Sequence, residues 1–530
     1  MPFFNMKLTK SELATQHSES RATKNIRKIS LLVAGVVIGV SGMLEAKNAY
    51  SAEEQFFPLL VYRTGPYAPS GIPVANGFRD YYDMLNKRDG GINGVKLTWE
   101  ECETKYNTKT GVECYEKLKN KGKTAVINPF STGITYQLIP KASVDKIPIL
   151  SMGYGRTSAA DGTIFPWIFN FPTTYWSQAS AVVRYIGSQE GGLGNLKGKK
   201  IAHVYHNSAY GKEANPTLDA LSKKFSFELI KLAVDHPGQE QKATWLQIRR
   251  KKPDWVFMSG WGVMNQVAIK EAANIKFPMD HFIGNWWSGS HADVIPAGKS
   301  SIGYKSSAMH ATGTNYQAHR DILKYVYGGD EAKAKANKWG EVLYNRTILN
   351  AVFATEAVRT AQGKYGKKAM TGEQMRWGFE NLNLTKARLA ELGLGGFTNP
   401  VKVSCSDHET GGPIAIQQWD GNKWNIVSDW IKPFRDVVWP MVKSSAAKYA
   451  AENNMPIDSV YLTRYDRKKA EKLREKTFND LKSDNLEDDT LYFFVYYDNS
   501  ELDSRTKKSW DFLNKKRQDS DFVGEIDGVK

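Results

Sequence analysis

The fold class is decided by KKIAHVYH (199–206), GKEANPTLDALSKKF (211–225) and DWVFMSG (254–260). The first and third are short apolar runs of the kind found in buried strands, whereas the second carries apolar residues at helical spacing. The same order continues in the helix-like VMNQVAIKEAANIK (263–276) and the strand-like HFIGNWW (281–287). Strands that alternate with helices in this way predict a parallel sheet with helices on both faces.

The first half of the chain repeats the alternation. Strand-like runs occupy 56–65, 95–101, 124–130 and 147–153, and helix-like runs lie between them. The stretch FPWIFNFPTTY (165–175) then carries few signals of either kind. This break favours two doubly wound α/β units over one long sheet.

The last third of the chain departs from the alternation. Residues 335–362 and 372–382 have helical spacing, Asp420-Gly421 marks the turn of a hairpin, and a C-terminal helix is expected at 434–456. Residues 457–530 are dense in charges of both signs and are interpreted as a charged tail or a small appended module.

Composition limits the function. The chain has 530 residues, of which 41% are hydrophobic, and a net charge of +16. This hydrophobic content excludes a wholly disordered chain. The basic residues are not gathered into one stripe, so nucleic acid is not an expected partner.

The N-terminus has the pattern of an export signal. Lys24, Arg27 and Lys28 precede an uncharged apolar run at 29–44, which is shorter than the roughly 20 residues that a membrane-spanning helix needs. Small residues follow at 49–52. We therefore expect residues 1–52 to be a signal peptide, cleaved near Ser51 or Ala52, and the mature protein to lie in the periplasm. An uncleaved membrane anchor is the alternative.

Export affects how the cysteines are interpreted. Cys102 ends a strand-like run and Cys114 lies in the helix-like run that follows. A disulfide between them can persist in an oxidising compartment; two buried thiols are the alternative. Cys405 is the odd cysteine in the chain.

The loops that follow the predicted strands are the candidate ligand site, because doubly wound sheets bind ligands outside the carboxyl ends of their strands. Ser131 and Thr132 combine hydroxyls with the free amides of a helix start, which suits a carboxylate, although either could simply cap the helix. Glycines in the next loop let backbone approach a ligand, and aromatic residues after later strands suggest a pocket wall. The candidate residues are Ser131, Thr132, Gly153, Tyr154, Gly155, Tyr210, Trp261 and Trp286.

Motifs of catalysis are missing from the sequence. It contains no G-x-S-x-G, H-E-x-x-H or G-x-x-x-x-G-K-[ST] pattern. Cys405, Asp407 and His408 form a compact polar trio, for which hydrogen bonding within a connecting loop is the better interpretation. We therefore expect no catalytic residue, metal or cofactor.

Several segments together resemble the branched-chain amino acid family of solute-binding proteins of ABC importers. They are TGPYAPSGIPVANGF, DGGINGVKL, the loop at Ser131-Thr132, SAYGKE at 208–213 and PDWVFMSG at 253–260. The resemblance covers about 56–445. It implies the type I periplasmic-binding-protein fold, in which two α/β lobes joined by a three-strand hinge close on a ligand, and it implies a membrane permease with ATPase subunits as the partner.

The resemblance also implies domain boundaries. Lobe 1 would comprise 53–170 and 310–410, and lobe 2 would comprise 171–309 and 411–433. The chain would cross between them near 169–175, 303–311 and 410–415.

In this family the loops matching Ser131 and Gly153–Gly155 hold the ligand carboxylate, and aromatics matching Tyr210 and Trp261 come from the second lobe. Family members have an acidic residue that pairs with the ligand ammonium. This sequence has Asn285 followed by Trp286 at the matching position, so the acid has no counterpart here. The resemblance implies a branched-chain amino acid as the ligand, whereas the missing acid favours an amide, a carboxylate or an aromatic solute. A ligand-sensing protein that feeds a receptor, instead of a permease, is the alternative function.

Overall fold

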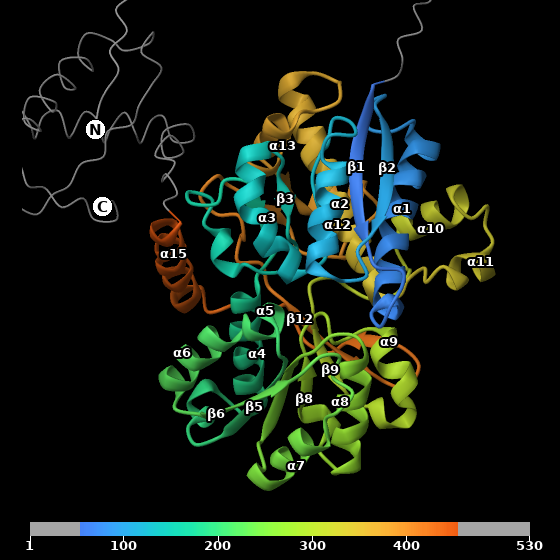
Figure 1. The fold of residues 1–530 in the computed structure, drawn as a ribbon. Helices are drawn as coiled ribbons and strands as arrows, with labels where there is room; N and C mark the ends of the chain where they lie inside the picture. The colour runs from blue at the N-terminus through green and yellow to red at the C-terminus, as the bar shows by residue number, and fades with distance from the viewer. Residues whose placement is uncertain (1–52, 454–530) are drawn as a thin grey trace, which may run out of the picture. The chain divides into compact units, whose positions relative to one another are not determined.

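The computed structural model describes residues 53–453, shown in colour in Figure 1. The predicted signal peptide and the predicted tail at 457–530 lie outside the described residues. The strands are β1 (Glu54–Val61), β2 (Lys96–Glu103), β3 (Ile149–Leu150), β4 (Ile168–Phe169), β5 (Lys200–His206), β6 (Glu228–Val234), β7 (Trp255–Ser259), β8 (Phe282–Gly284), β9 (Lys305–Ala308), β10 (Asn383–Leu384), β11 (Val401–Lys402), β12 (Ala415–Trp419) and β13 (Trp424–Ile426).

Helices connect most of these strands. They are α1 (Ala68–Asp89), α2 (Thr108–Leu118), α3 (Thr132–Asp145), α4 (Tyr175–Gln189), α5 (Ala209–Lys212), α6 (Asn215–Phe225), α7 (Lys242–Lys251), α8 (Val263–Asn274), α9 (His291–Val294), α10 (Gln317–Tyr325), α11 (Glu331–Ala336), α12 (Val342–Tyr365), α13 (Gly372–Glu380), α14 (Lys386–Glu391) and α15 (Arg435–Glu452), with short 3-10 turns η1 (Thr157–Ala160), η2 (Leu193–Leu196), η3 (Met279–His281) and η4 (Ile295–Ser301).

The larger sheet contains seven strands in the order β13-β12-β9-β8-β7-β5-β6. Strands β5 to β9 run parallel, whereas β12 is antiparallel to both β9 and β13. Successive residues of β7 alternate between two cores: Phe257 packs in the cluster that contains α4 and α6 residues, and Val256 packs with residues of α7 and α8. Because strand side chains point alternately to opposite faces, helices cover both faces of this sheet, as predicted.

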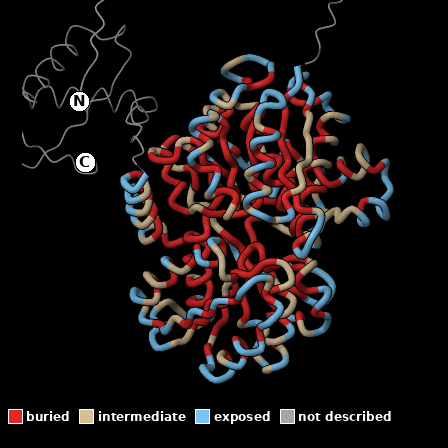
Figure 2. The backbone as a smooth tube through the Cα atoms, viewed as in Figure 1, coloured by how far each residue is buried: buried red, intermediate tan, exposed pale blue. Residues whose placement is uncertain are grey.

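A second set of parallel strands is built from the first part of the chain. β1 pairs with β2, and β3 pairs with β4. The two pairs are connected by single bridges from residues 124–128, with Thr124 against Phe56, Asn128 against Leu59 and Ile127 against Ile149. The prediction of a continuous strand at 124–130 was therefore wrong in extent, although the segment lies between β1 and β3. Buried residues form the interior of this region and exposed residues its rim (Figure 2).

The predicted helix at 335–362 was wrong as a single element. The structure divides it into α11 and α12, and Gly340 between them has φ = 81°. This left-handed conformation is unfavourable for residues other than glycine, and a Cβ at this position would lie 2.2 Å from Thr314 Cγ2. The glycine thus breaks the helix, and the predicted helix at 372–382 and the hairpin at 420–421 are found as α13 and β12–β13.

Helix α15 packs against α4 and against the segment that begins with η1. Its Val438 and Val442 pack with Trp176 of α4 and with Ala160 of η1. Further along α15, Lys443 Nζ contacts Asp161 at 2.9 Å, and Tyr449 packs on Phe165. Among the described residues, no helix combines the length and apolarity needed to span a bilayer.

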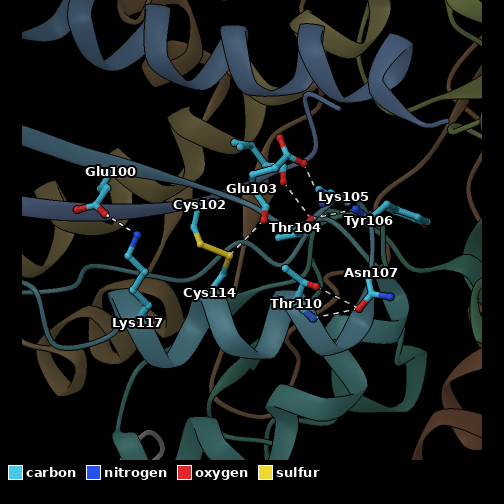
Figure 3. Close-up of a disulfide and its surroundings, with 11 residues drawn as sticks. Glu100, Cys102, Glu103, Thr104, Lys105, Tyr106, Asn107, Thr110, Cys114 and Lys117 are labelled. Carbon is cyan, nitrogen blue, oxygen red and sulfur yellow. Dashed lines mark hydrogen bonds and ion pairs between the residues drawn. A yellow bond between two sulfur atoms is a disulfide. The ribbon is translucent and has the colours of Figure 1, made fainter. Parts of the chain in front are cut away.

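Cys102 of β2 and Cys114 of α2 are joined by a disulfide, with their Cα atoms 5.7 Å apart (Figure 3). The bridge attaches the end of a strand to the helix that follows it. Cys405 is buried in the connection between β11 and β12. In the same connection His408 stacks on Phe169, and Asp407 pairs with Arg435.

Removing the bridge is expected to lower the free energy of unfolding by about 3 kcal/mol, because the disulfide closes a short loop in the unfolded chain. Urea denaturation of the Cys102→Ser, Cys114→Ser double variant measures this loss. A reductant should destabilise the wild type and leave the double variant unchanged; equal stability of the two proteins under oxidising conditions would contradict the expectation.

Candidate functional site

The loops after β3 and β8, which belong to different sheets, meet at Gly153. Its carbonyl oxygen accepts hydrogen bonds from Trp286 Nε1 at 2.9 Å and from Trp287 Nε1 at 2.6 Å. Gly153 has φ = 76°, and a Cβ there would lie 3.0 Å from the Trp287 ring. Glycine is thus required twice, by the backbone conformation and by the approach of the tryptophans.

Aromatic rings fill the space around this contact. Tyr154 stacks on Trp287 with ring centroids 4.6 Å apart, and Tyr175 stacks on Trp286 at 5.2 Å. Trp261 meets the Trp287 ring edge-on at 5.5 Å. All five side chains are buried. We call these five residues the aromatic cluster.

Polar groups surround the aromatic cluster. Ser131 is the N-cap of α3, where its hydroxyl accepts from the Ile134 N–H, and Thr132 Oγ1 accepts from the Gly155 N–H at 3.2 Å. Tyr210 donates to the Gly260 carbonyl oxygen at 2.8 Å and accepts from Asn285 Nδ2 at 2.8 Å. The loops after β3, β5, β7 and β8 therefore bring the predicted residues to one region, together with the start of α3.

Several residues of this region were not predicted from the sequence. Tyr175 lies at the first turn of α4, in a stretch with few helix or strand signals. Trp287 was passed over in favour of its neighbour Trp286. Arg346 lies in α12, about 60 residues further along the chain. Its signal was available: it is the one charge between Glu341 and Glu356 in an otherwise uncharged helical run.

A pocket of about 260 Å³ lies beside the cluster. Its lining residues are Tyr136, Arg156, Thr157, Ser158, Trp176, Ala209, Lys212, Glu213, Pro216 and Ser445. Burial raises the pKa of Glu213, which accepts hydrogen bonds from Tyr136 and from Thr157. This contact connects the two sheets, since Glu213 follows β5 whereas Tyr136 belongs to α3, which leads into β3.

The first acid after Trp286 and Trp287 in the sequence is already engaged. Asp293 accepts from the Ser290 N–H at 2.7 Å and from Asn265 Nδ2 at 2.9 Å, and it completes the cap of α9. Burial raises the pKa of Asp293 to about 6. Within residues 53–453, no group of three or more His, Cys, Asp or Glu side chains is placed to hold a metal ion.

Asp293 is expected to make the protein's stability depend on pH. Its pKa in the folded state lies above the ordinary 3.8, so the folded protein binds this proton more tightly than the unfolded chain does. The resulting stabilisation is present below pH 3.8 and is lost as the pH rises through about 6. Urea denaturation at pH 4.5 and 7.5 should therefore show Asp293→Asn gaining stability relative to wild type at the higher pH. A difference in the free energy of unfolding between variant and wild type that is the same at both pH values would contradict this.

Comparison with known proteins places the chain among binding proteins. A family model described as periplasmic binding protein matches residues 54–423, and one described as DUF6311 C-terminal domain matches 433–530. A solved structure from the Pseudomonas fluorescens group, described as an ABC transporter permease, is 45% identical with a TM-score of 0.71; the match covers 76% of this chain and 98% of that one.

Two further relatives carry names that mention ligands. The Leu/Ile/Val-binding protein BraC3 of Rhizobium johnstonii is 26% identical over 329 residues, which are 58% of this chain and 86% of the relative. A branched-chain amino acid ABC transporter from Thermus thermophilus with bound valine has a TM-score of 0.62 at 20% identity, and the match covers 73% of this chain and 100% of that one. The resemblance and the type I fold predicted from the sequence are confirmed: the chain belongs to the periplasmic binding protein family.

Proposed function

We propose that this protein is the extracytoplasmic solute-binding subunit of an ABC importer. It captures a small solute between its two lobes and delivers it to a membrane permease with ATPase subunits. The observation that carries the proposal is the pair of tryptophan N–H groups on the Gly153 carbonyl oxygen, because these bonds connect the ligand-facing loops of the two sheets. A closed cleft of this kind is the state that a permease distinguishes from the open one.

The proposed lobes follow the chain. Lobe 1 comprises 53–170 and 310–410, lobe 2 comprises 171–309 and 411–433, and α15 continues beyond them. The passage of the chain between the two sheets after β4, after β9 and before β12 supports this division.

The proposed ligand site is the aromatic cluster and its polar surroundings. Ser131, Thr132 and the Gly153–Gly155 loop hold the polar end of the solute, and Tyr210, Trp261 and Trp286 enclose its apolar part. The hydroxyls of Tyr154 and Tyr175 and the Trp261 N–H are buried and have no hydrogen-bond partner within residues 53–453, so they remain available to a ligand.

The proposed place of action is the periplasm, reached through the signal peptide at 1–52. N-terminal sequencing of the protein from its source organism tests the cleavage near Ser51 or Ala52. A mature protein that keeps residues 29–44 would be a membrane-anchored form instead.

Uptake by cells tests the transport role. A strain that lacks the protein should lose high-affinity uptake of the solute that raises the protein's melting temperature in a thermal-shift panel, and uptake should return with the wild-type gene. Unchanged uptake together with a lost response to the solute would favour a sensing role over transport.

A further inference from the structure

Arg346 is a fully buried cation at the proposed ligand site. It lies in α12 with an exposed fraction of 0%. One guanidinium nitrogen donates to the Trp286 carbonyl oxygen at 3.1 Å, and the Arg346 Cζ atom lies 5.1 Å from the Trp287 ring centroid. Its Nε and second terminal nitrogen have no hydrogen-bond partner among the described residues.

No carboxylate in the described part of the chain balances this charge. Arg346 forms no ion pair there, and Glu356 on the same helix pairs instead with Arg359 and Arg388. Asp293 is engaged by Ser290 and Asn265. Burial lowers the pKa of Arg346 to about 9, and the groups that oppose this shift are the phenols of Tyr154 and Tyr175.

Other buried polar groups around Arg346 also lack hydrogen-bond partners among the described residues. In this part of the chain, the buried hydroxyls of Tyr154 and Tyr175 and the Trp261 N–H have no hydrogen-bond partner. His310 donates from Nδ1 to the Ala311 carbonyl oxygen, so its Nε2 is an unused acceptor, and burial and the Arg346 charge lower the His310 pKa well below its ordinary value. Tyr154 and Tyr175 stack on the two tryptophans that Arg346 contacts. One indole N–H, two hydroxyls that can donate and an unpaired positive charge are thus gathered at one buried place.

Such an arrangement is complementary to an anion. A buried charge is costly unless it is paired, and a buried donor is costly unless it is satisfied. A carboxylate supplies negative charge and acceptor oxygens, and it can take two parallel N–H bonds from a guanidinium. An ammonium group would add a second positive charge, and the buried acid next to the site, Glu213, already accepts hydrogen bonds from Tyr136 and Thr157.

We propose that Arg346 binds the anionic group of the ligand and that the ligand is a small organic carboxylate without an ammonium group. This inference rests on the proposed function, because it names the solute class of the same site. It adds a residue from the lobe 1 helix α12 to the loops that the sequence pointed to.

Two sets of three matched compounds test the solute class. The first is 4-methylpentanoate, 4-methylpentanamide and L-leucine, and the second is 3-phenylpropanoate, 3-phenylpropanamide and L-phenylalanine. Within each set the shape is nearly constant, while the charge is that of an anion, a neutral amide or a zwitterion. Calorimetry on the mature protein, unfolded and refolded to remove bound solute, should show at least one carboxylate binding tenfold or more tightly than its two partners.

The outcomes separate the inference from the proposed function. An amide or amino acid that binds as tightly as its carboxylate would overturn the inference and leave the proposed function standing. The same holds if the only solutes that bind are neutral, cationic or zwitterionic. If no solute binds, and none is carried by the protein from its source, both proposals fail.

Arg346→Gln tests the residue. It should weaken binding of the carboxylate probe about 100-fold and change binding of the matching amide less than threefold. Arg359→Gln is the matched control, since Arg359 lies on the same helix and pairs with Glu356; it should leave both affinities unchanged.

The stability of the solute-free protein distinguishes a ligand contact from a structural role. Removing an unpaired buried charge should leave the melting temperature of solute-free Arg346→Gln equal to or above that of wild type. The carboxylate probe should raise the melting temperature of the variant less than it raises that of the wild type. A large fall in that temperature, or failure of the variant to fold, would show that Arg346 supports the fold instead and would overturn the proposal.

Discussion

Replacing Gly153 with alanine is expected to weaken solute binding about 30-fold. The added Cβ would lie 3.0 Å from the Trp287 ring and 3.2 Å from Trp286 Nε1, so the two tryptophans could not both keep their hydrogen bonds to the Gly153 carbonyl oxygen. Two such bonds contribute about 2 kcal/mol together, and each 1.4 kcal/mol is a factor of ten in affinity. Calorimetry with the solute released from the native protein measures the loss.

Gly298→Ala is the matched control for this variant. Gly298 also has a left-handed φ, 57°, but a Cβ there would meet no atom within 4 Å. The control shares the conformational strain of about 1–2 kcal/mol without the contact with the tryptophans. Equal affinities of the two variants would mean that the contact at Gly153 has no part in binding.

Trp286→Ala is expected to weaken solute binding at least tenfold. The side chain is fully buried, stacks on Tyr175 and donates to Gly153, so its removal takes away a wall of the site and one of the bonds between the lobes. The substitution also costs stability, about 3–5 kcal/mol for a buried tryptophan, so affinity and melting temperature must both be measured.

Two further variants separate these contributions. Trp286→Phe keeps a ring against Tyr175 and loses the N–H, so its affinity should lie between those of wild type and Trp286→Ala. Trp245→Ala removes an equally buried tryptophan from α7, in the core on the outer side of the large sheet, and should lower stability with no change in affinity. Unchanged affinity in Trp286→Ala would refute the assignment of this residue to the site.

Local sequence patterns were enough to predict the α/β class. The apolar runs at 199–206 and 254–260 became β5 and β7 because short buried strands need little more than a continuous apolar segment bounded by turns. The segment at 124–130 looked similar, yet it forms only single bridges, because its pairing depends on where β1 and β3 lie, which no local pattern contains.

The site was partly predictable for a related reason. Loops that follow parallel strands meet at one edge of a sheet, so Gly153 and Trp286 could each be singled out by position alone. The hydrogen bond between them could not be predicted, because it joins two sheets whose relative placement depends on packing far from either loop. Arg346 was missed because a charge inside a helix usually faces solvent, and only the fold shows that this one is buried.

Native mass spectrometry of the protein purified from its source organism tests whether this protein holds a small solute between two lobes. We predict a species heavier than the mature chain by one small molecule, which is lost on denaturation and restored when the released solute is added back. A single species at the mass of the bare chain, with no solute retained on adding the released fraction, would contradict the account.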